Sequence, residues 1–200
     1  TLGSVDTICV DKTGTLTEGK MRVVKVEFLD REIAEQTLIT TNNQVNAVDN
    51  ALFEWLDVNV SARNLVDYHE IEIIERKIFS SDDKFSAAKT NEYIHIVGAP
   101  ELLLEKSSLS KKDQKQWLEL IESEASNGKR IVALAYLKNE SEQNIEELPD
   151  NLNWNGLVFI EDPVREGLEE NFAATARAGI DVKVITGDIQ TTALAVMKQV

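Results

Sequence analysis

Residues 5–17 read VDTICVDKTGTLT, a segment that indicates an α/β fold. Its first half is apolar and rich in β-forming residues, and a glycine-containing loop follows at once, which is typical of a buried strand in a parallel sheet. Ligands of open parallel sheets bind beyond the carboxyl ends of the strands, which is where Asp11 falls. A carboxylate in that position can act as a nucleophile and form an aspartyl phosphate. A polar turn with Asp11 as a helix N-cap is the structural alternative.

Two loops have the features of an anion site. In the first, Gly14 and its small neighbours let backbone N–H groups turn toward an anion, and Lys12 adds a positive charge. In the second, Thr186-Gly187-Asp188 combines a hydroxyl, a glycine and an expected helix N-terminus, which together can receive a phosphate. A simple helix cap is the alternative for the second loop.

The C-terminal quarter repeats the parallel pattern. Strands are expected over 156–160 and 181–185, with helices over 165–178 and from Ile189 onward. This spacing of strand, helix, strand and helix indicates parallel strands. Together with the strand before Asp11, it predicts a three-stranded parallel sheet with an exposed edge.

The middle of the chain has a different pattern, in which alternating strands and amphipathic helices are mixed. The expected elements are a strand over 21–29 with Val24, Val26 and Phe28 on one face, helices over 31–40 and 47–59, antiparallel strands within 69–97, helices from Pro100 and Ser110, and a strand over 130–137. The polar, acidic segment 138–153 is the expected linker. The predicted fold class is therefore α/β, a partial Rossmann-type parallel sheet with an inserted α+β domain built on an antiparallel sheet.

Composition excludes several classes. The chain of 200 residues carries a formal charge of −14, which argues against nucleic acid as a partner. No apolar run approaches the roughly 20 residues that cross a bilayer, and no signal peptide is recognisable, so a soluble chain is expected. Cys9 lies in an apolar run and is expected to be a buried, reduced thiol. His69 and His95 have no partners at metal-ligand spacing, so structural zinc is not expected.

The segment Asp11-Lys12-Thr13-Gly14-Thr15-Leu16-Thr17 resembles, residue for residue, the phosphorylation signature of P-type ATPases, a branch of the haloacid-dehalogenase-like fold. The resemblance implies that ATP phosphorylates Asp11, and that the Asp11 carboxylate and the Thr13 backbone carbonyl help to hold Mg²⁺. Hydrolases of this fold usually carry a second Asp where this chain has Thr13. Without that acid, an acyl phosphate should hydrolyse more slowly, as a pump requires.

Two further segments are similar to motifs of the same family. Thr186-Gly187-Asp188 resembles the phosphate-binding loop, which implies that Thr186 contacts the transferred phosphoryl group and that Asp188 lies near Mg²⁺. The segment 161–165 resembles the hinge Asp-Pro-Pro-Arg, with Val164 in place of the second proline, and brings Asp162 and Arg165 toward the nucleotide. As a local structure, Asp162 is expected to be the N-cap of the following helix.

The inserted domain resembles the nucleotide-binding domain of the family. The resemblance implies that Phe79 stacks on adenine, that Lys84 contacts the nucleotide, and that Asp49 and Arg130 approach the adenine and the phosphates. The alternatives are a core Phe, a surface Asp and a solvated Arg. Gly98-Ala99-Pro100-Glu101 matches the end of the motif Lys-Gly-Ala-Pro-Glu, but Val97 replaces the lysine, which leaves ATP binding weaker or differently supported.

These resemblances imply a division of the chain and a function. Residues 1–20 and 154–200 would form part of a phosphorylation domain, and 21–153 the nucleotide-binding domain. The full-length protein would be a multi-pass cell-membrane pump that couples ATP hydrolysis to cation transport, with this part cytoplasmic and no partner protein evident. Because a further phosphate-site lysine and a Gly-Asp-Gly-x-Asn-Asp loop are missing, the chain as given is expected to be a catalytically incomplete fragment. A soluble phosphatase and a non-catalytic nucleotide-binding module are the alternatives.

Overall fold

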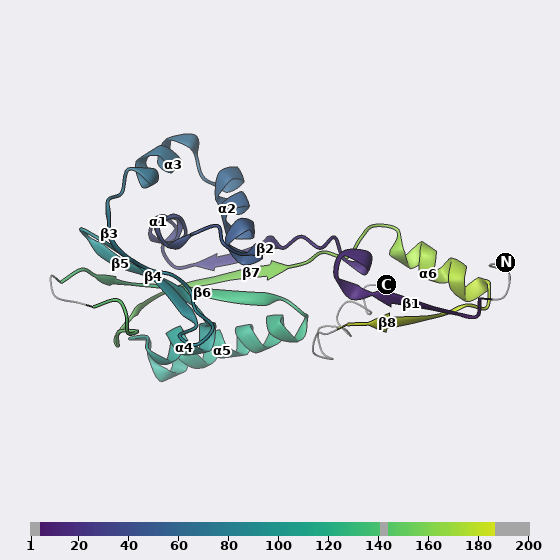
Figure 1. The fold of residues 1–200 in the computed structure, drawn as a ribbon. Helices are drawn as coiled ribbons and strands as arrows, with labels where there is room; N and C mark the ends of the chain where they lie inside the picture. Colours follow the sequence, from purple (N-terminus) through teal and green to yellow (C-terminus); the bar gives the residue numbers. More distant parts are fainter. Residues whose placement is uncertain (1–4, 141–143, 187–200) are drawn as a thin grey trace.

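The computed structural model describes residues 5–140 and 144–186, which form two sheets (Figure 1). A six-stranded antiparallel sheet has the order β2-β7-β6-β5-β4-β3, and a parallel pair consists of β1 and β8. The strands are β1 Thr7–Asp11, β2 Arg22–Phe28, β3 Ile73–Lys77, β4 Phe85–Thr90, β5 Tyr93–Gly98, β6 Arg130–Lys138, β7 Asn153–Glu161 and β8 Asp181–Ile185. The predicted α/β class, with a small parallel sheet and a larger inserted antiparallel unit, is confirmed.

Six α-helices and a short π-helical turn complete the described part of the chain. They are η1 Lys12–Leu16, α1 Arg31–Thr41, α2 Ala47–Asn59, α3 Ala62–His69, α4 Pro100–Glu105, α5 Lys111–Ser126 and α6 Leu168–Arg177. The helices predicted over 31–40, 47–59 and from Ser110 are confirmed. Each begins directly after a residue whose side chain caps the first turn. Asn46, for example, accepts from two N–H groups of the first turn of α2. No helix in the described part of the chain is long and apolar enough to span a membrane.

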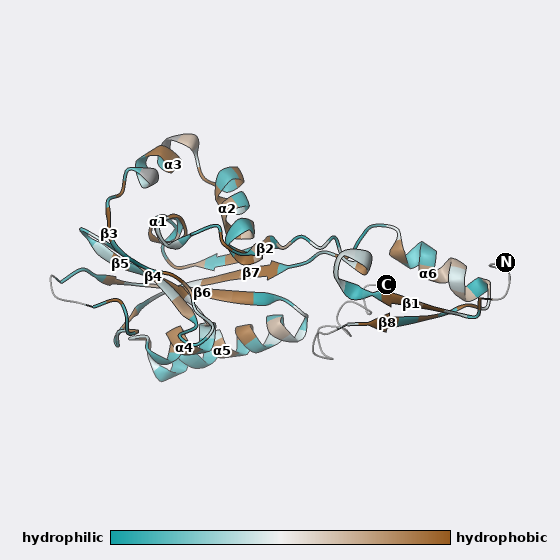
Figure 2. Ribbon diagram, viewed as in Figure 1, coloured by the Kyte–Doolittle hydropathy of each residue, from teal (hydrophilic) through white to brown (hydrophobic). Residues whose placement is uncertain are grey.

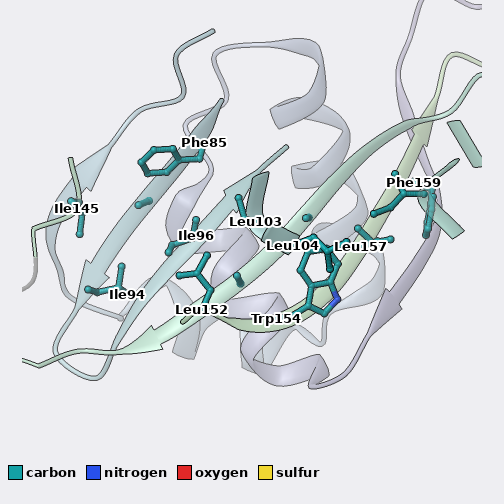
Figure 3. Close-up of a cluster of buried hydrophobic side chains, with 14 residues drawn as sticks. Phe85, Ile94, Ile96, Leu103, Leu104, Ile145, Leu152, Trp154, Leu157 and Phe159 are labelled. Carbon is teal, nitrogen blue, oxygen red and sulfur yellow. The ribbon is translucent and has the colours of Figure 1, made fainter. Parts of the chain in front are cut away.

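Helices cover both faces of the large sheet (Figure 1). One face packs against α4 and α5 in a cluster that includes Phe85, Leu103 and Trp154 (Figure 3). The other face packs against α1, α2 and α3, and its cluster includes Leu38 and Leu134. Figure 2 shows the consequence: β7 and β6, in the middle of the unit, are hydrophobic along most of their length, whereas α5 is largely hydrophilic.

The strand over 156–160 was wrongly predicted to be parallel. It lies within β7, which pairs antiparallel with β2 on one side and with β6 on the other. Its run of apolar residues reflects burial on both faces, which the centre of this antiparallel sheet shares with a parallel sheet. The described part of the parallel sheet therefore has two strands, where three were predicted.

The prediction of a linker over 138–153 is also wrong. This segment joins β6 to β7, two neighbouring strands of one sheet, so it connects elements within a unit. Two of its residues, Ile145 and Leu152, are 1% and 0% exposed and belong to the core. These two apolar residues are widely spaced among acidic ones, so the sequence pattern did not indicate that they are buried.

Two residues lie on unexpected faces. A register shift between Val23 and Lys25 turns Val24 outward, so that it is 44% exposed, while Val26 and Phe28 still pack toward the core. Cys9 was expected to be buried but is exposed. Among the described elements, α6 packs against the two-stranded sheet, and Cys9 alternates with the partly buried residues of β1.

Candidate functional site

Two segments, 17–21 and 161–165, join the two sheets and run side by side (Figure 1). An isolated antiparallel bridge pairs Thr17 with Val164. The chain leaves the first unit and returns to it through adjacent segments. Any rotation between the two units must therefore change the backbone conformation of these residues. We call the two segments the hinge.

Asp162 is not the N-cap of the following helix, as was expected. Its carboxylate accepts the Thr17 hydroxyl at 2.6 Å, the Gly19 N–H at 2.8 Å and the Lys20 N–H at 3.1 Å. The next helix, α6, begins six residues later, after a left-handed residue at Gly167. Asp162 therefore fastens one hinge segment to the other.

Arg165 connects the hinge to the loop after β1. Its Nε donates to the Thr17 carbonyl at 3.0 Å and its Nη2 donates to the Gly14 carbonyl at 2.8 Å. The fork of the guanidinium thus holds two backbone oxygens of one loop in a fixed relation. The predicted contact of Asp162 and Arg165 with nucleotide stays a prediction, since both side chains are engaged with the hinge and the loop.

Thr17 lies at the centre of this network and is completely buried. Its hydroxyl accepts from the Gly14 N–H at 3.2 Å and lies within reach of two acceptors, Asp162 at 2.6 Å and the Lys12 carbonyl at 3.3 Å. A hydroxyl has one hydrogen, and the shorter distance assigns it to Asp162. Thr17 belongs to the sequence motif, but no role was predicted for it, because its partner Asp162 lies 145 residues away.

The candidate phosphoryl acceptor lies at the carboxyl end of β1. Asp11 and Thr13 are exposed, whereas the side chain of Lys12 is buried. The parallel register pairs Asp11 with Ile185, so Thr186 follows directly at the same edge of the sheet. The two anion-site loops predicted from the sequence therefore begin side by side.

The described residues fit a magnesium ion only in part. The Asp11 carboxylate and the Thr13 carbonyl are hard oxygen ligands of the kind that Mg²⁺ takes together with several waters. Asp188, which was predicted to lie near the Mg²⁺ site, and Gly187 of the same phosphate-binding loop lie outside the described residues. Within the described ranges there is no group of three or more His, Cys, Asp or Glu side chains that could hold a metal ion.

The candidate nucleotide residues gather at one end of the large sheet. Phe79 follows β3, Lys84 precedes β4, Gly98 ends β5 and Arg130 begins β6. Because these strands are antiparallel neighbours, all four positions lie at the same end. That end is also where β7 leaves the sheet toward the hinge (Figure 1).

Alternation along the strands places Arg130 on the face that packs against α1, α2 and α3, with Val132 and Leu134. Val97, at the position of the family lysine, points to the same face and is 8% exposed. With the aliphatic Val97 at this position, the candidate nucleotide site lacks the positive charge that a lysine would supply. Phe79 is 46% exposed, which leaves its ring available for stacking and argues against the core alternative.

Asp49 lies in the first turn of α2 and contacts the loop that joins α1 to α2. Its carboxylate accepts the Val45 N–H at 3.2 Å, and the Asn43 side chain accepts from Arg76 of β3 at 3.2 Å. The loop therefore lies beside β3, the strand that leads to Phe79. Asp49 has a structural role in holding this loop, and its contact with adenine stays a prediction.

Comparison with known proteins identifies the family. Residues 34–167 match the family model described as "P-type ATPase, cytoplasmic domain N", which is more than half of the chain. A "Probable cation-transporting P-type ATPase" of Mycoplasma genitalium is 32% identical over all of this chain and 25% of its own length. A "Calcium-transporting ATPase 1" of Lactococcus lactis is 31% identical over all of this chain and 27% of its own length. A "Putative calcium-transporting ATPase 13, plasma membrane-type" of Arabidopsis thaliana is 26% identical over 98% of this chain and 24% of its own length.

The chain thus spans about a quarter of the length of these curated relatives. The match to the family model begins inside α1 and ends after the hinge, so it includes most of the six-stranded unit. The chain therefore belongs to the P-type ATPase family and contains the family's cytoplasmic domain N.

Proposed function

We propose that this chain binds ATP and accepts its terminal phosphoryl group on Asp11, as the cytoplasmic part of a cation-transporting membrane pump. The observation that carries the proposal is the arrangement of two sites on either side of one hinge. The exposed carboxylate of Asp11 lies beside Thr186 on one unit, and the candidate nucleotide residues lie at the end of the other unit that leads to the hinge.

The reaction follows from this arrangement. The Asp11 carboxylate attacks the terminal phosphorus of ATP, a P–O bond to the leaving ADP breaks, and an acyl phosphate forms. Arg165 and Thr17 hold the loop that carries the acceptor, which keeps its backbone N–H groups in position. When bound, Mg²⁺ neutralises charge on the phosphates, and Asp11 with the Thr13 carbonyl would hold it. Thr13 lacks a carboxyl group, so the chain offers no acid or base at that position to hydrolyse the product.

The proposal includes a revised division of the chain. The pairing of β7 with β2 and β6 in the six-stranded sheet supports a second boundary at the hinge near 161–165, in place of the one expected at residue 154. We therefore assign 21–161 to the nucleotide-binding domain, and 1–20 with 162–200 to the phosphorylation domain. The transported cation would be selected in membrane helices elsewhere in the full-length protein.

Calorimetric titration with Mg-ATP tests nucleotide binding directly. One-to-one saturable binding is expected, and both Phe79→Ala and Lys84→Ala should weaken it, by about tenfold each if stacking and charge contribute about 1.4 kcal/mol apiece. Lys112→Ala removes the same charge from the exposed surface of α5 and should leave affinity unchanged. A folded chain that does not bind millimolar Mg-ATP would remove the nucleotide site from the proposal.

A further inference from the structure

The turn that joins β3 to β4 contains two of the candidate nucleotide residues, Phe79 and Lys84. Lys84 has a φ of 60°, a left-handed conformation that residues with a side chain adopt rarely. Such a conformation persists only where the surrounding structure holds it, and it occurs often at ligand-binding sites. The contacts that hold Lys84 therefore determine where its ammonium group can lie.

Backbone hydrogen bonds fix Lys84 from both sides. Its N–H donates to the Ser80 carbonyl at 2.9 Å, and its own carbonyl accepts from the Ala99 N–H at 2.9 Å. A Cβ at Gly98 would lie 2.8 Å from the same Lys84 carbonyl oxygen, so the absence of a side chain lets the end of β5 come this close. The turn is thus closed between Ser80 and Lys84 and is attached to the end of β5.

An ion pair connects this turn to β3. Lys77, the last residue of β3, lies with its Nζ 2.9 Å from Oδ2 of Asp83. The same carboxylate oxygen accepts the Ser80 hydroxyl at 2.7 Å, and that hydroxyl accepts the Asp83 N–H at 3.0 Å. Asp83 therefore joins the end of β3 to the residue that closes the turn.

Lys77 is itself held firmly, on the face of the sheet opposite to Val97. Its side chain is 10% exposed, and its ammonium lies 5.1 Å from the centre of the Phe85 ring, which belongs to the cluster beside α4 and α5. Val97 packs on the side of α1, α2 and α3. Because a largely buried cation is costly without an anion, Lys77 keeps Asp83 in place, with Glu146 as a more distant partner at 3.5 Å.

We propose that Lys77 and Asp83 are positioning residues for nucleotide binding. Their ion pair orients the turn so that the Phe79 ring and the Lys84 ammonium are in place before ATP arrives, which lowers the cost of ordering the loop on binding. Val97 supplies no positive charge, so the site depends all the more on where Lys84 lies. The inference rests on the proposed function, which assigns Phe79 and Lys84 to the nucleotide.

Calorimetric titration with Mg-ATP tests the positioning role. Lys77→Met keeps the aliphatic stem over Phe85 and removes the charge, and it should weaken binding by roughly three- to fivefold, the effect that a partly exposed ion pair can have. Lys77→Arg retains the charge and should bind nearly as wild type does. Lys106→Met breaks a comparable ion pair, with Asp150 at 2.6 Å, near the start of β7, and should leave the affinity unchanged.

Asp83→Asn separates positioning from simple electrostatics. It removes a negative charge next to Lys84, which by charge alone would favour the phosphates and strengthen binding. If the carboxylate positions the turn, binding weakens instead, and the double variant with Lys77→Met binds no worse than either single variant. Affinity in Asp83→Asn equal to or higher than that of wild type would overturn the proposal. If Lys77→Met does not fold, Asp83→Asn, at a side chain that is 43% exposed, carries the test.

Hydrogen exchange of the Lys84 amide, which donates to the Ser80 carbonyl, follows the turn without nucleotide. This amide should exchange faster in Lys77→Met and in Asp83→Asn, and exchange as slow as in wild type would show that the ion pair does not hold the turn. A wild-type chain that does not bind Mg-ATP would overturn the nucleotide site and the positioning role together. Equal binding by wild type and Lys77→Met would overturn the positioning role alone.

Discussion

Thr17 joins two parts of the chain that are far apart in sequence, because its single hydroxyl hydrogen goes to Asp162 while its oxygen accepts from Gly14. It thereby links the conformation of the phosphorylation loop to that of the hinge. Gly14 has a φ of 77°, in the left-handed region that glycine adopts readily, and its N–H donates to the Thr17 hydroxyl. The hydrogen bonds of this one residue therefore connect the two units.

Replacing Thr17 with Val keeps the volume and removes the hydroxyl. We expect the free energy of unfolding to fall by about 1–3 kcal/mol, since a partly buried carboxylate loses its shortest hydrogen bond. Urea denaturation measures the loss. Thr17→Ser retains the hydroxyl and should recover most of the stability; equal losses in both variants would show that the hydrogen bond contributes little.

His95 gives the chain a pH-dependent stability. Its ring is 1% exposed, Thr37 contacts its Nδ1 at 2.9 Å, and burial lowers its pKa to about 4 from 6.5. The unfolded chain therefore takes up the proton first as the pH falls. The stabilisation is complete above pH 6.5 and is lost as the pH falls from 6.5 to 4, by roughly 3 kcal/mol in total.

Urea unfolding of wild type and His95→Gln at several pH values between 4 and 7 checks this expectation. The difference in stability between the two should shrink toward low pH, because the variant has no group to protonate at that position. Parallel curves for the two proteins would contradict the assignment of this pH dependence to His95.

At the scale of elements, two glycines mark where strands approach other parts of the chain closely. A Cβ at Gly98 would lie 2.8 Å from the Lys84 carbonyl oxygen and 2.8 Å from the Leu103 side chain. A Cβ at Gly156 would lie 1.9 Å from the Glu27 carbonyl oxygen, at a φ of 130°. The close packing of β5 on the start of β4 thus depends on the absence of a side chain at Gly98. The pairing of β2 with β7 depends in the same way on Gly156.

Both substitutions to Ala should destabilise the fold, in a fixed order. Gly98→Ala is expected to cost about 1–3 kcal/mol through overpacking. Gly156→Ala should cost more, because its Cβ would lie only 1.9 Å from a backbone oxygen and the φ of 130° adds strain. Thermal unfolding of the two variants tests the order, and a Gly156→Ala protein as stable as wild type would refute the close approach of β2 and β7.

Elements were predictable where periodicity and capping agree, as in α1, α2 and α5, each of which starts after a capping side chain. The partnership of β7 was not predictable, because a short apolar run is equally compatible with a buried parallel or antiparallel strand. The hinge contacts of Asp162 were missed for a related reason. A local capping pattern at Asp162-Pro163 suggested a nearby partner, whereas the actual partners are 142 to 145 residues away.

At the scale of the whole molecule, two units are joined by one hinge (Figure 1). The motifs identified Asp11 and the residues around Thr186 from local sequence, and the parallel pairing of β1 with β8 places these two positions at one edge. The gathering of Phe79, Lys84 and Arg130 at one end of the other sheet follows from strand order, which the sequence does not specify. Their roles remain predictions, to be tested by nucleotide binding.

Transfer of a phosphoryl group to Asp11 can be assayed in the full-length protein. The full-length protein is incubated with Mg-ATP labelled on the terminal phosphate, quenched in acid and assayed for covalently bound label. Wild type and Asp6→Asn, an exposed change just before the same strand, should both incorporate label that is lost at alkaline pH, as expected of an acyl phosphate. Asp11→Asn should incorporate none, whereas label that persists in Asp11→Asn would contradict the account.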